Sequence, residues 1–247
     1  MSSASTPNAQ ANTEEFEFAA LQEANNYRQA LLADFSGCLQ GQVLEVGAGI
    51  GQFSRAIKNL PSVKRLLSIE PDPKFLPRLR TVLPEEDIIA GTVSDAPPGL
   101  AWDAIVNINV LEHIEADERE LTLYRALLSP QQGHLCLFVP ARPEIYGPID
   151  KDFGHFRRYT KPELRAKLEK AGFEILTLRY YNSLGYFAWW LNFRVLKQRG
   201  FARWAVRFYD RVAFPVVRWA ERHLGAPPFG QSLLAIARAR PVPDGAN

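Results

Sequence analysis

A glycine-rich turn with a nearby carboxylate combines residue types and a spacing that could bind a reactive ligand. Residues 43–51 read VLEVGAGIG, an apolar run followed by glycines at 47, 49 and 51. Glycine has no Cβ, so the backbone of such a turn can pass close to a ligand. A turn that holds a pyrophosphate has the spacing G-x-G-x-x-G, whereas this one has G-x-G-x-G and places Glu45 two residues before its first glycine. A carboxylate there would repel a pyrophosphate, so the turn predicts a site for a cationic ligand of the nucleotide type.

A second carboxylate, Glu70, lies nineteen residues after Gly51 in the sequence SIEPD. An acidic residue at the end of a second strand, at about this spacing, typically binds ribose hydroxyls. S-adenosylmethionine joins a ribose to a sulfonium and an ammonium group, so it suits both acids. The alternative is a glycine turn with two solvated acids, which the order of strand, turn, helix, strand and acid disfavours.

Two of the four histidines, His113 and His155, lie where ligands collect in an open α/β sheet. Because histidine titrates near neutral pH, either residue can take a proton from a substrate. The structural alternatives are that His113 closes over the cofactor and that His155 bonds to the backbone. In the same segment as His155, Arg158 either holds an acidic substrate group or pairs with a neighbouring aspartate. Tyr159 either orients the substrate or packs under the segment.

Composition and charge limit the classes of function. The chain has 247 residues, enough for one sizeable core, and a hydrophobic fraction of 47%, which is ordinary for a globular protein. A net charge of +2 argues against nucleic acid as a partner. Cys38 and Cys136 form no C-x-x-C pattern, so neither a disulfide framework nor a metal site is expected. No secretory signal precedes Arg28, the first basic residue, and no apolar run is long enough to cross a bilayer, so we expect a cytoplasmic protein.

Alternating strands and helices must position these residues. The apolar run that begins at Val43 is the first expected strand. A second strand should end at Glu70, and further strands are expected at 87–90, 103–108, 133–139, 173–181 and 232–237. Helices are expected at 14–34, 73–81, 116–128 and 160–172. The alternation predicts an α/β fold with a doubly wound, mostly parallel sheet. The segment 140–159 is too polar and too rich in glycine and proline for a regular element, and we expect it to form a lid over the site.

The motifs VLEVGAGIG, SIEPD and DAIVNINVLEHI, in this order, resemble those of class I S-adenosylmethionine-dependent methyltransferases. The resemblance covers about residues 40–182 and implies the Rossmann-like seven-stranded sheet of that family, whose last strand inserts antiparallel. It also implies S-adenosylmethionine as cofactor and S-adenosylhomocysteine as product. The run Gly-His-x-Arg-Arg-Tyr at 154–159 is similar to a bacterial subgroup of these enzymes.

The resemblance also implies which residues bind the cofactor. The methionine part would be lined by the residues of the glycine turn: Glu45, Gly47, Ala48 and Gly49. The ribose would be bound at the end of the second strand, by Glu70 and Pro71. The adenine would lie beside the residues after the third strand, Thr92 and Val93, and the sulfonium end would lie near Asn107.

Residues 183–230 form a basic, aromatic insert before the last expected strand. This stretch has eight basic residues against two acids and four of the five tryptophans. It predicts two or three amphipathic helices broken at Gly200 and Pro215. Three interpretations stay open: a cap that builds an aromatic-lined substrate pocket, a peripheral contact with a membrane surface, and either a subunit interface, for example in a homodimer, or simply additional core. We expect the methyltransferase core at 14–182 and 231–240, the insert on the substrate side, and tails at 1–13, which we expect to be disordered, and 241–247.

These features together predict an enzyme that moves the methyl group of S-adenosylmethionine to a small or medium acceptor, apolar and aromatic, such as an indole-type carbon in natural-product tailoring. Methyl transfer from a sulfonium requires no metal. The candidate catalytic residues are His113, His155 and Tyr159, and the candidate substrate contacts are Tyr27, His113, Arg158, Tyr181 and Trp189. The alternatives are a membrane-surface methyltransferase for a lipid or quinone-like acceptor, a non-catalytic S-adenosylmethionine-binding protein and, less favoured, a dinucleotide oxidoreductase.

Overall fold

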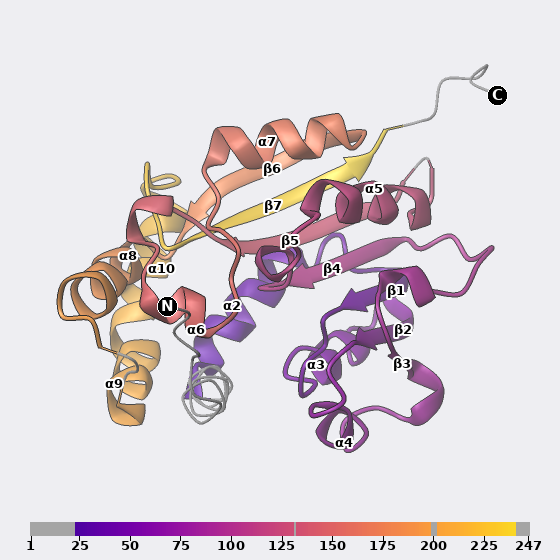
Figure 1. The fold of residues 1–247 in the computed structure, drawn as a ribbon, viewed down its shortest axis with the longest axis horizontal. Coiled ribbons are helices and arrows are strands. Elements are labelled where there is room, and N and C mark those ends of the chain that lie inside the picture. The colour runs from indigo at the N-terminus through magenta and orange to yellow at the C-terminus, as the bar shows by residue number, and fades with distance from the viewer. Residues whose placement is uncertain (1–22, 131, 199–201, 241–247) are drawn as a thin grey trace, which may run out of the picture.

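A seven-stranded sheet runs through the centre of the molecule (Figure 1). The computed structural model describes residues 23–130, 132–198 and 202–240. The strand order is β3-β2-β1-β4-β5-β7-β6, and β7 pairs antiparallel with both β5 and β6. The strands are β1 (Gly41–Val46), β2 (Val63–Glu70), β3 (Ile88–Ala90), β4 (Ala104–Ile108), β5 (His134–Pro140), β6 (Phe173–Tyr181) and β7 (Ser232–Ala239). This arrangement confirms the predicted Rossmann-like methyltransferase sheet.

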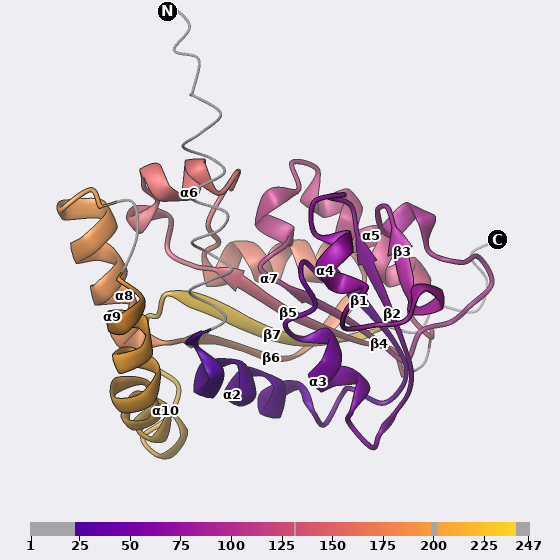
Figure 2. The ribbon, with the colours of Figure 1, turned by 90° about the horizontal axis from the view of Figure 1, so that it is seen from below.

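Helices cover both faces of the sheet and create two apolar clusters (Figure 2). On one face lie α2 (Asn25–Phe35), α3 (Ser54–Lys58) and α4 (Leu76–Leu79), whose buried apolar side chains share one cluster with residues of β1 and β2. On the other face lie α5 (Asp117–Leu127) and α7 (Lys161–Lys170). Because β4 and β5 are covered on both sides, nearly all their residues are buried, which explains their continuous apolar sequence.

The helical insert lies at the carboxyl edge of the sheet. Because β6 is parallel to β5, the chain leaves β6 at that edge and returns to it at the start of β7. The insert consists of α8 (Ser183–Trp189), which continues as a π-helix (Trp190–Val195), and of α9 (Arg203–Phe208), a second π-helix (Tyr209–Ala213) and α10 (Phe214–His223). Figures 1 and 2 both show α8, α9 and α10 together at one end of the molecule. None of the helices in the described ranges is long and apolar enough to span a membrane.

The expected break at Pro215 is wrong, because the backbone stays helical from Arg203 to His223. A proline lacks the N–H of an α-helical hydrogen bond, and the wider π-helical turn that precedes it accommodates the missing bond. The other expected break, at Gly200, lies outside the described residues.

The segment 140–159 is more regular than its composition predicts. It contains a 3₁₀ turn (Pro143–Ile145) and the short helix α6 (Pro148–Asp152). Pro148 occupies the first helical position, where its missing N–H costs nothing, and the carboxylate of Asp150 accepts a hydrogen bond from Gly147 N at 2.9 Å. The expectation of an irregular segment is therefore wrong.

Two helix boundaries also differ from the prediction. Helix α4 begins at Leu76 rather than at 73, because Pro77 fits only in the first turn of a helix. Helix α2 begins at Asn25, and the earlier part of the expected helix at 14–34 lies largely outside the described residues. The expected tails at 1–13 and 241–247 also lie outside them.

Candidate active site

The glycine turn leaves β1 in a conformation that only glycine adopts readily. Gly47, Gly49 and Gly51 have φ values of 76°, 56° and 79°. A Cβ on Gly47 would lie 2.2 Å from Cγ2 of Val110. The backbone of the turn thus packs directly against the segment after β4, with no room for a side chain at Gly47.

The side chain of Glu70 is hydrogen-bonded to this turn. Its Oε2 accepts a hydrogen bond from Gly49 N at 2.6 Å, and its Oε1 accepts one from Asp72 N at 2.9 Å. Burial raises the pKa of Glu70, and the two backbone hydrogen bonds oppose that rise. The carboxylate predicted to bind ribose therefore lies beside the glycines predicted to line the methionine part.

Glu45 lies deeper than the rest of the turn. Its Oε2 accepts hydrogen bonds from Ser54 Oγ at 2.6 Å and from Ser68 Oγ at 2.7 Å. Burial raises the pKa of Glu45 to about 7. Its predicted contact with the methionine part stays a prediction, because its carboxylate oxygen already bonds to hydroxyl groups of α3 and β2.

The remaining predicted cofactor-binding residues lie near the carboxyl ends of β3 and β4. Thr92 caps a 3₁₀ turn at Val93–Asp95, and its N–H donates to Asp95 Oδ2 at 2.8 Å. Asn107 lies on β4 opposite Val46, the last residue of β1. Its Nδ2 donates to the Tyr124 hydroxyl at 2.7 Å, while its buried Oδ1 has no partner among the described residues. These positions fit S-adenosylmethionine: a backbone cradle that a Cβ would fill, a carboxylate beside it and an unpaired amide oxygen on the next strand.

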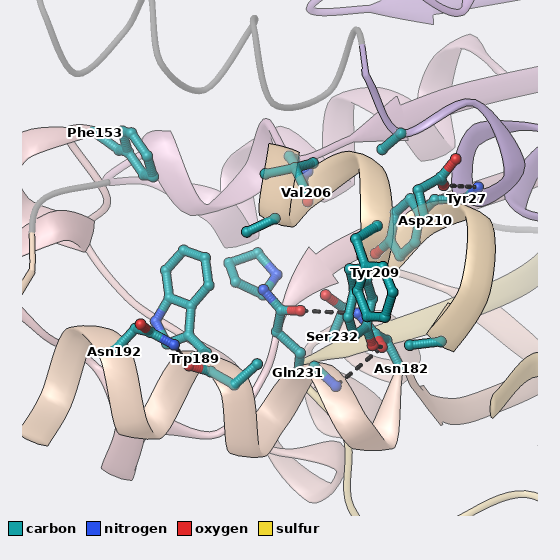
Figure 3. Close-up of a pocket in the computed structure, with 18 of the residues that line it drawn as sticks. Tyr27, Phe153, Asn182, Trp189, Asn192, Val206, Tyr209, Asp210, Gln231 and Ser232 are labelled. Carbon is teal, nitrogen blue, oxygen red and sulfur yellow. Dashed lines mark hydrogen bonds between the residues drawn. The ribbon is translucent and has the colours of Figure 1, made fainter. Parts of the chain in front are cut away.

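A cavity of about 440 Å³ opens between the sheet edge and the insert (Figure 3). Its aromatic lining comes from α2, the segment 140–159 and the insert: Tyr27, Phe153, Trp189, Trp204, Phe208 and Tyr209. Its polar lining is Asn109, Glu112, His155, Arg158, Asn182, Asn192, Asp210, Gln231 and Ser232. The cavity thus brings together four predicted substrate or catalytic residues: Tyr27, His155, Arg158 and Trp189.

A buried ion pair holds the polar wall of this cavity. Asp150 Oδ1 lies 3.1 Å from His155 Nδ1 and accepts a hydrogen bond from Arg158 Nε at 2.7 Å. The Arg158 guanidinium also stacks over the Trp189 ring, 4.6 Å from its centroid. Burial lowers the pKa of His155, and Asp150 opposes that shift. Of the two alternatives for Arg158, the structure shows the pairing with an aspartate.

Three predicted residues are not among those that line the cavity. His113 packs edge-on against His155, with the ring centroids 4.7 Å apart, and burial lowers its pKa to about 3. Tyr159 is buried, and its hydroxyl donates to Asp117 Oδ2 at 2.8 Å. Tyr181 is buried in a cluster of rings with Tyr27, Phe138 and Phe214. The direct roles predicted for these three residues stay predictions.

The sequence motifs did not single out four residues of the cavity wall. Glu112 stands beside His113 in the LEHI motif but is fully buried. Asn182 adopts a left-handed conformation with φ 62°, and its side chain caps α8 by accepting from Gly185 N at 3.1 Å. Gln231 bonds to the Asn182 side chain at 3.0 Å, and Asp210 bonds to the start of α2. An asparagine directly between a strand and a helix was a signal for the cap, but the sequence offers no comparable signal for the other three.

A family model described as a methyltransferase domain matches residues 18–178. The chain belongs to this family of methyltransferase domains. It is an S-adenosylmethionine-dependent methyltransferase with the class I fold. No curated protein sequence matches this methyltransferase.

Solved structures similar to this methyltransferase share its fold at low identity. The DhpI–S-adenosylhomocysteine complex is 15% identical, with a TM-score of 0.59, and the alignment covers 95% of each chain. The 1,6-didemethyltoxoflavin-N1-methyltransferase of Burkholderia thailandensis is 17% identical, with a TM-score of 0.55, and covers 97% of this chain and 93% of its own. The N-methyltransferase NodS of Bradyrhizobium japonicum is 17% identical, with a TM-score of 0.52 and coverage of 85% and 84%.

Proposed function

We propose that this methyltransferase acts on a small or medium, apolar and aromatic acceptor held in the cavity between the insert and the sheet edge. The observation that carries the proposal is the cavity itself, with its aromatic lining and one polar wall. Pockets for small molecules commonly have this composition, with a few polar groups that fix orientation. One similar structure, the 1,6-didemethyltoxoflavin-N1-methyltransferase, holds the small molecule 1,6-didemethyltoxoflavin together with S-adenosylhomocysteine.

We assign the cofactor to the glycine turn. Gly47 and Gly49 would receive the methionine part, Glu70 the ribose, Thr92 and Val93 the adenine, and Asn107 the sulfonium end. The cofactor supplies an activated methyl group on a sulfur that leaves uncharged. The protein's own contribution is to align the acceptor with that methyl group and to exclude water, which supplies up to about 7–11 kcal/mol. Asn109 and Pro140 line the cavity at the ends of β4 and β5, so the acceptor would approach from that side.

Binding of S-adenosylhomocysteine tests the cofactor site. We expect calorimetric titration to show binding to the wild type and a large loss in Glu70→Ala, because the ribose loses its acceptor. The exposed Glu86→Ala substitution is the control and should bind like the wild type. If the wild type binds no S-adenosylhomocysteine, with or without aromatic acceptors present, the assignment is wrong.

Two adjacent tryptophans test the acceptor cavity. Trp189 lines the cavity, whereas Trp190 is exposed and does not. In assays of labelled methyl transfer to a panel of indoles, phenols and quinols, Trp189→Ala should raise KM for every accepted compound. Trp190→Ala should leave KM unchanged. Equal effects of both substitutions would place the acceptor elsewhere.

The surface of the insert favours a second candidate, a membrane-surface methyltransferase for a lipid or quinone-like acceptor. Trp204, Phe208 and Val212 recur every four residues and are exposed, Trp204 by 73% of its surface. Exposed arginines stand one position before each of them: Arg203, Arg207 and Arg211. Apolar and basic rows side by side are typical of helices that lie on anionic membranes. Because Trp204 and Phe208 also line the cavity, an apolar acceptor would enter it from that surface.

Sedimentation with lipid vesicles tests this second candidate. We expect the enzyme to sediment with vesicles containing phosphatidylserine and not with pure phosphatidylcholine. Reversal of the three arginines to glutamate should abolish sedimentation. The matched control reverses three exposed arginines on other elements, Arg78, Arg119 and Arg165. If both triple variants lose binding equally, the effect comes from net charge alone and the insert is not the membrane contact.

A further inference from the structure

Three ligand-type side chains converge at the wall of the cavity. One ligand atom from each of Glu112, His113 and His155 lies within 4.8 Å of the others. Glu112 and His113 belong to the 3₁₀ turn after β4 (Leu111–His113), and His155 belongs to the segment that follows α6. A backbone hydrogen bond from Phe156 N to Glu112 O at 2.8 Å holds these two parts of the chain together.

Each imidazole has one ring nitrogen held by an acceptor of the protein. His155 Nδ1 bonds to Asp150, which is itself fixed by Arg158 and by Gly147 N. His113 bonds to the backbone of Phe153. His155 Nε2 is left buried without a hydrogen-bond partner among the described residues and lies 4.0 Å from Glu112 Oε1. Histidines that ligate metals are typically held in this way, with the second nitrogen bonded to a carboxylate or a carbonyl.

We propose that Glu112, His113 and His155 bind a divalent transition metal ion, with Zn²⁺ as its best representative, at the wall of the acceptor cavity. Two imidazoles and one carboxylate are a common ligand set for zinc, and three protein ligands leave a position open for a further molecule. Because Glu112 and His155 line the cavity, that open position faces it. Bonds of about 2.0–2.2 Å to the metal place ligand atoms roughly 3.4 Å apart. Metal binding would therefore shorten the present 4.0 Å separation of His155 Nε2 and Glu112 Oε1, and the separations of up to 4.8 Å within the cluster, to about that value.

The consequence for catalysis rests on the proposed function, whereas metal binding itself does not. An acceptor hydroxyl or ring N–H bound at the open position would lose its proton to solvent more readily, because the cation stabilises the resulting anion. A lone pair of the deprotonated acceptor would then form the bond to the methyl carbon while the carbon–sulfur bond breaks, and the electron pair of the broken bond would stay on sulfur. In this arrangement the two histidines hold the metal and the cavity needs no other base.

Metal titration of the full chain tests the site. After dialysis against a chelator, we expect one equivalent of Co²⁺ to produce visible absorption bands of a low-coordinate site, and Zn²⁺ to displace it. Glu112→Gln, which keeps the side-chain volume, and His155→Ala should each abolish the bands. Asp150→Asn should weaken Zn²⁺ binding by about 10–100-fold, as expected for a residue that orients a ligand.

The control variant is His223→Ala, which removes an exposed histidine of α10 and should bind metal like the wild type. Circular dichroism and thermal melting identify any variant that fails to fold, and Glu112→Gln then decides the question. The proposal is overturned if the wild type binds no stoichiometric metal, or if Glu112→Gln binds it as tightly as the wild type does. Methyl transfer by such a metal-free enzyme would leave the proposed function intact, so the two failures are distinguishable.

Discussion

Glu45 shows how one buried acid can make the stability of this fold depend on pH. Its carboxyl group is nearly inaccessible to solvent and bonds to two serine hydroxyls rather than to a cation. Burial favours the neutral form, so its pKa in the folded chain, about 7, lies above its ordinary value of 4.5. The folded enzyme therefore has to ionise an unfavourably placed group as the pH rises.

We expect Glu45→Gln to stabilise the enzyme at alkaline pH. Below pH 4.5 the carboxyl group is protonated in both the folded and the unfolded chain, and the stability that its neutral form contributes is fully present. This contribution is lost as the pH rises through about 7, the pKa in the folded chain. The loss amounts to at most about 3 kcal/mol at pH 8. Melting temperatures between pH 5 and 8 should fall less steeply in Glu45→Gln than in the wild type, while Glu86→Gln follows the wild type. A variant that melts below the wild type at pH 8 would contradict this expectation.

Gly47 offers a second test of a single position. Alanine there would both adopt an unfavourable left-handed conformation and collide with Val110. We expect Gly47→Ala to lose at least about 1–2 kcal/mol of stability and to bind S-adenosylhomocysteine at least tenfold more weakly. Gly37→Ala is the control, because a Cβ on Gly37 meets nothing within 4 Å. Unchanged calorimetric affinity in Gly47→Ala would show that the turn does not contact the ligand.

The helices around the cavity are joined by one carboxylate of the insert. Asp210, in the π-helix before α10, accepts hydrogen bonds from Asn26 N at 3.0 Å and Tyr27 N at 2.9 Å. These amides belong to the first turn of α2, which has no acidic residue or side-chain cap of its own. The insert thereby caps α2 and fixes Tyr27 at the cavity wall.

Replacing Asp210 should therefore loosen the cavity without affecting the glycine turn. We expect Asp210→Ala to lose about 1–3 kcal/mol of stability, because two amides lose a charged acceptor. KM for the acceptor should rise while the affinity for S-adenosylhomocysteine stays within twofold. Glu118→Ala, which removes an exposed ion pair with Lys170, is the control and should cost less than about 1 kcal/mol. Loss of S-adenosylhomocysteine binding in Asp210→Ala would contradict this separation of the two sites.

The same elements explain how much the sequence could predict. The parallel strands were predictable because a strand buried on both faces, such as β4, needs a continuous apolar run. The glycine turn and Glu70 were predictable because their spacing is local. By contrast, the contact of Asp210 with Tyr27 joins residues 183 positions apart, and the pairing of His155 with Asp150 required the unforeseen helix α6. Neither contact has a periodicity or a spacing that the sequence reveals.

Charge is distributed unevenly over the whole molecule. The stretch 183–230 has eight basic residues and two acids, a net charge of +6, whereas the whole chain has +2, so the rest of the chain has −4. Two of its exposed arginines, Arg203 and Arg207, directly precede the cavity-lining residues Trp204 and Phe208. We therefore expect an anionic partner to approach the enzyme from the side of the insert.

The salt dependence of vesicle binding tests whether the positive charge of the insert contributes to membrane contact. If the insert contacts anionic lipid through its arginines, affinity for phosphatidylserine vesicles should fall steeply between 50 and 500 mM NaCl, roughly as the Debye length shortens. The apolar row should retain part of the binding at high salt. Affinity that does not change with salt would contradict an electrostatic contribution from Arg203, Arg207 and Arg211.

The position of β7 determines when this sheet can be completed. β7 comes last along the chain yet lies between β5 and β6, and the edge strand β6 pairs with no other strand in the described part of the sheet. A nascent chain that has made everything up to the insert therefore still has β5 as an open edge and β6 without a partner. Such pairings between distant segments form slowly, and unpaired strand edges invite aggregation. The sheet of this enzyme can therefore close only after β7 has been made, and not when its cofactor-binding half is complete.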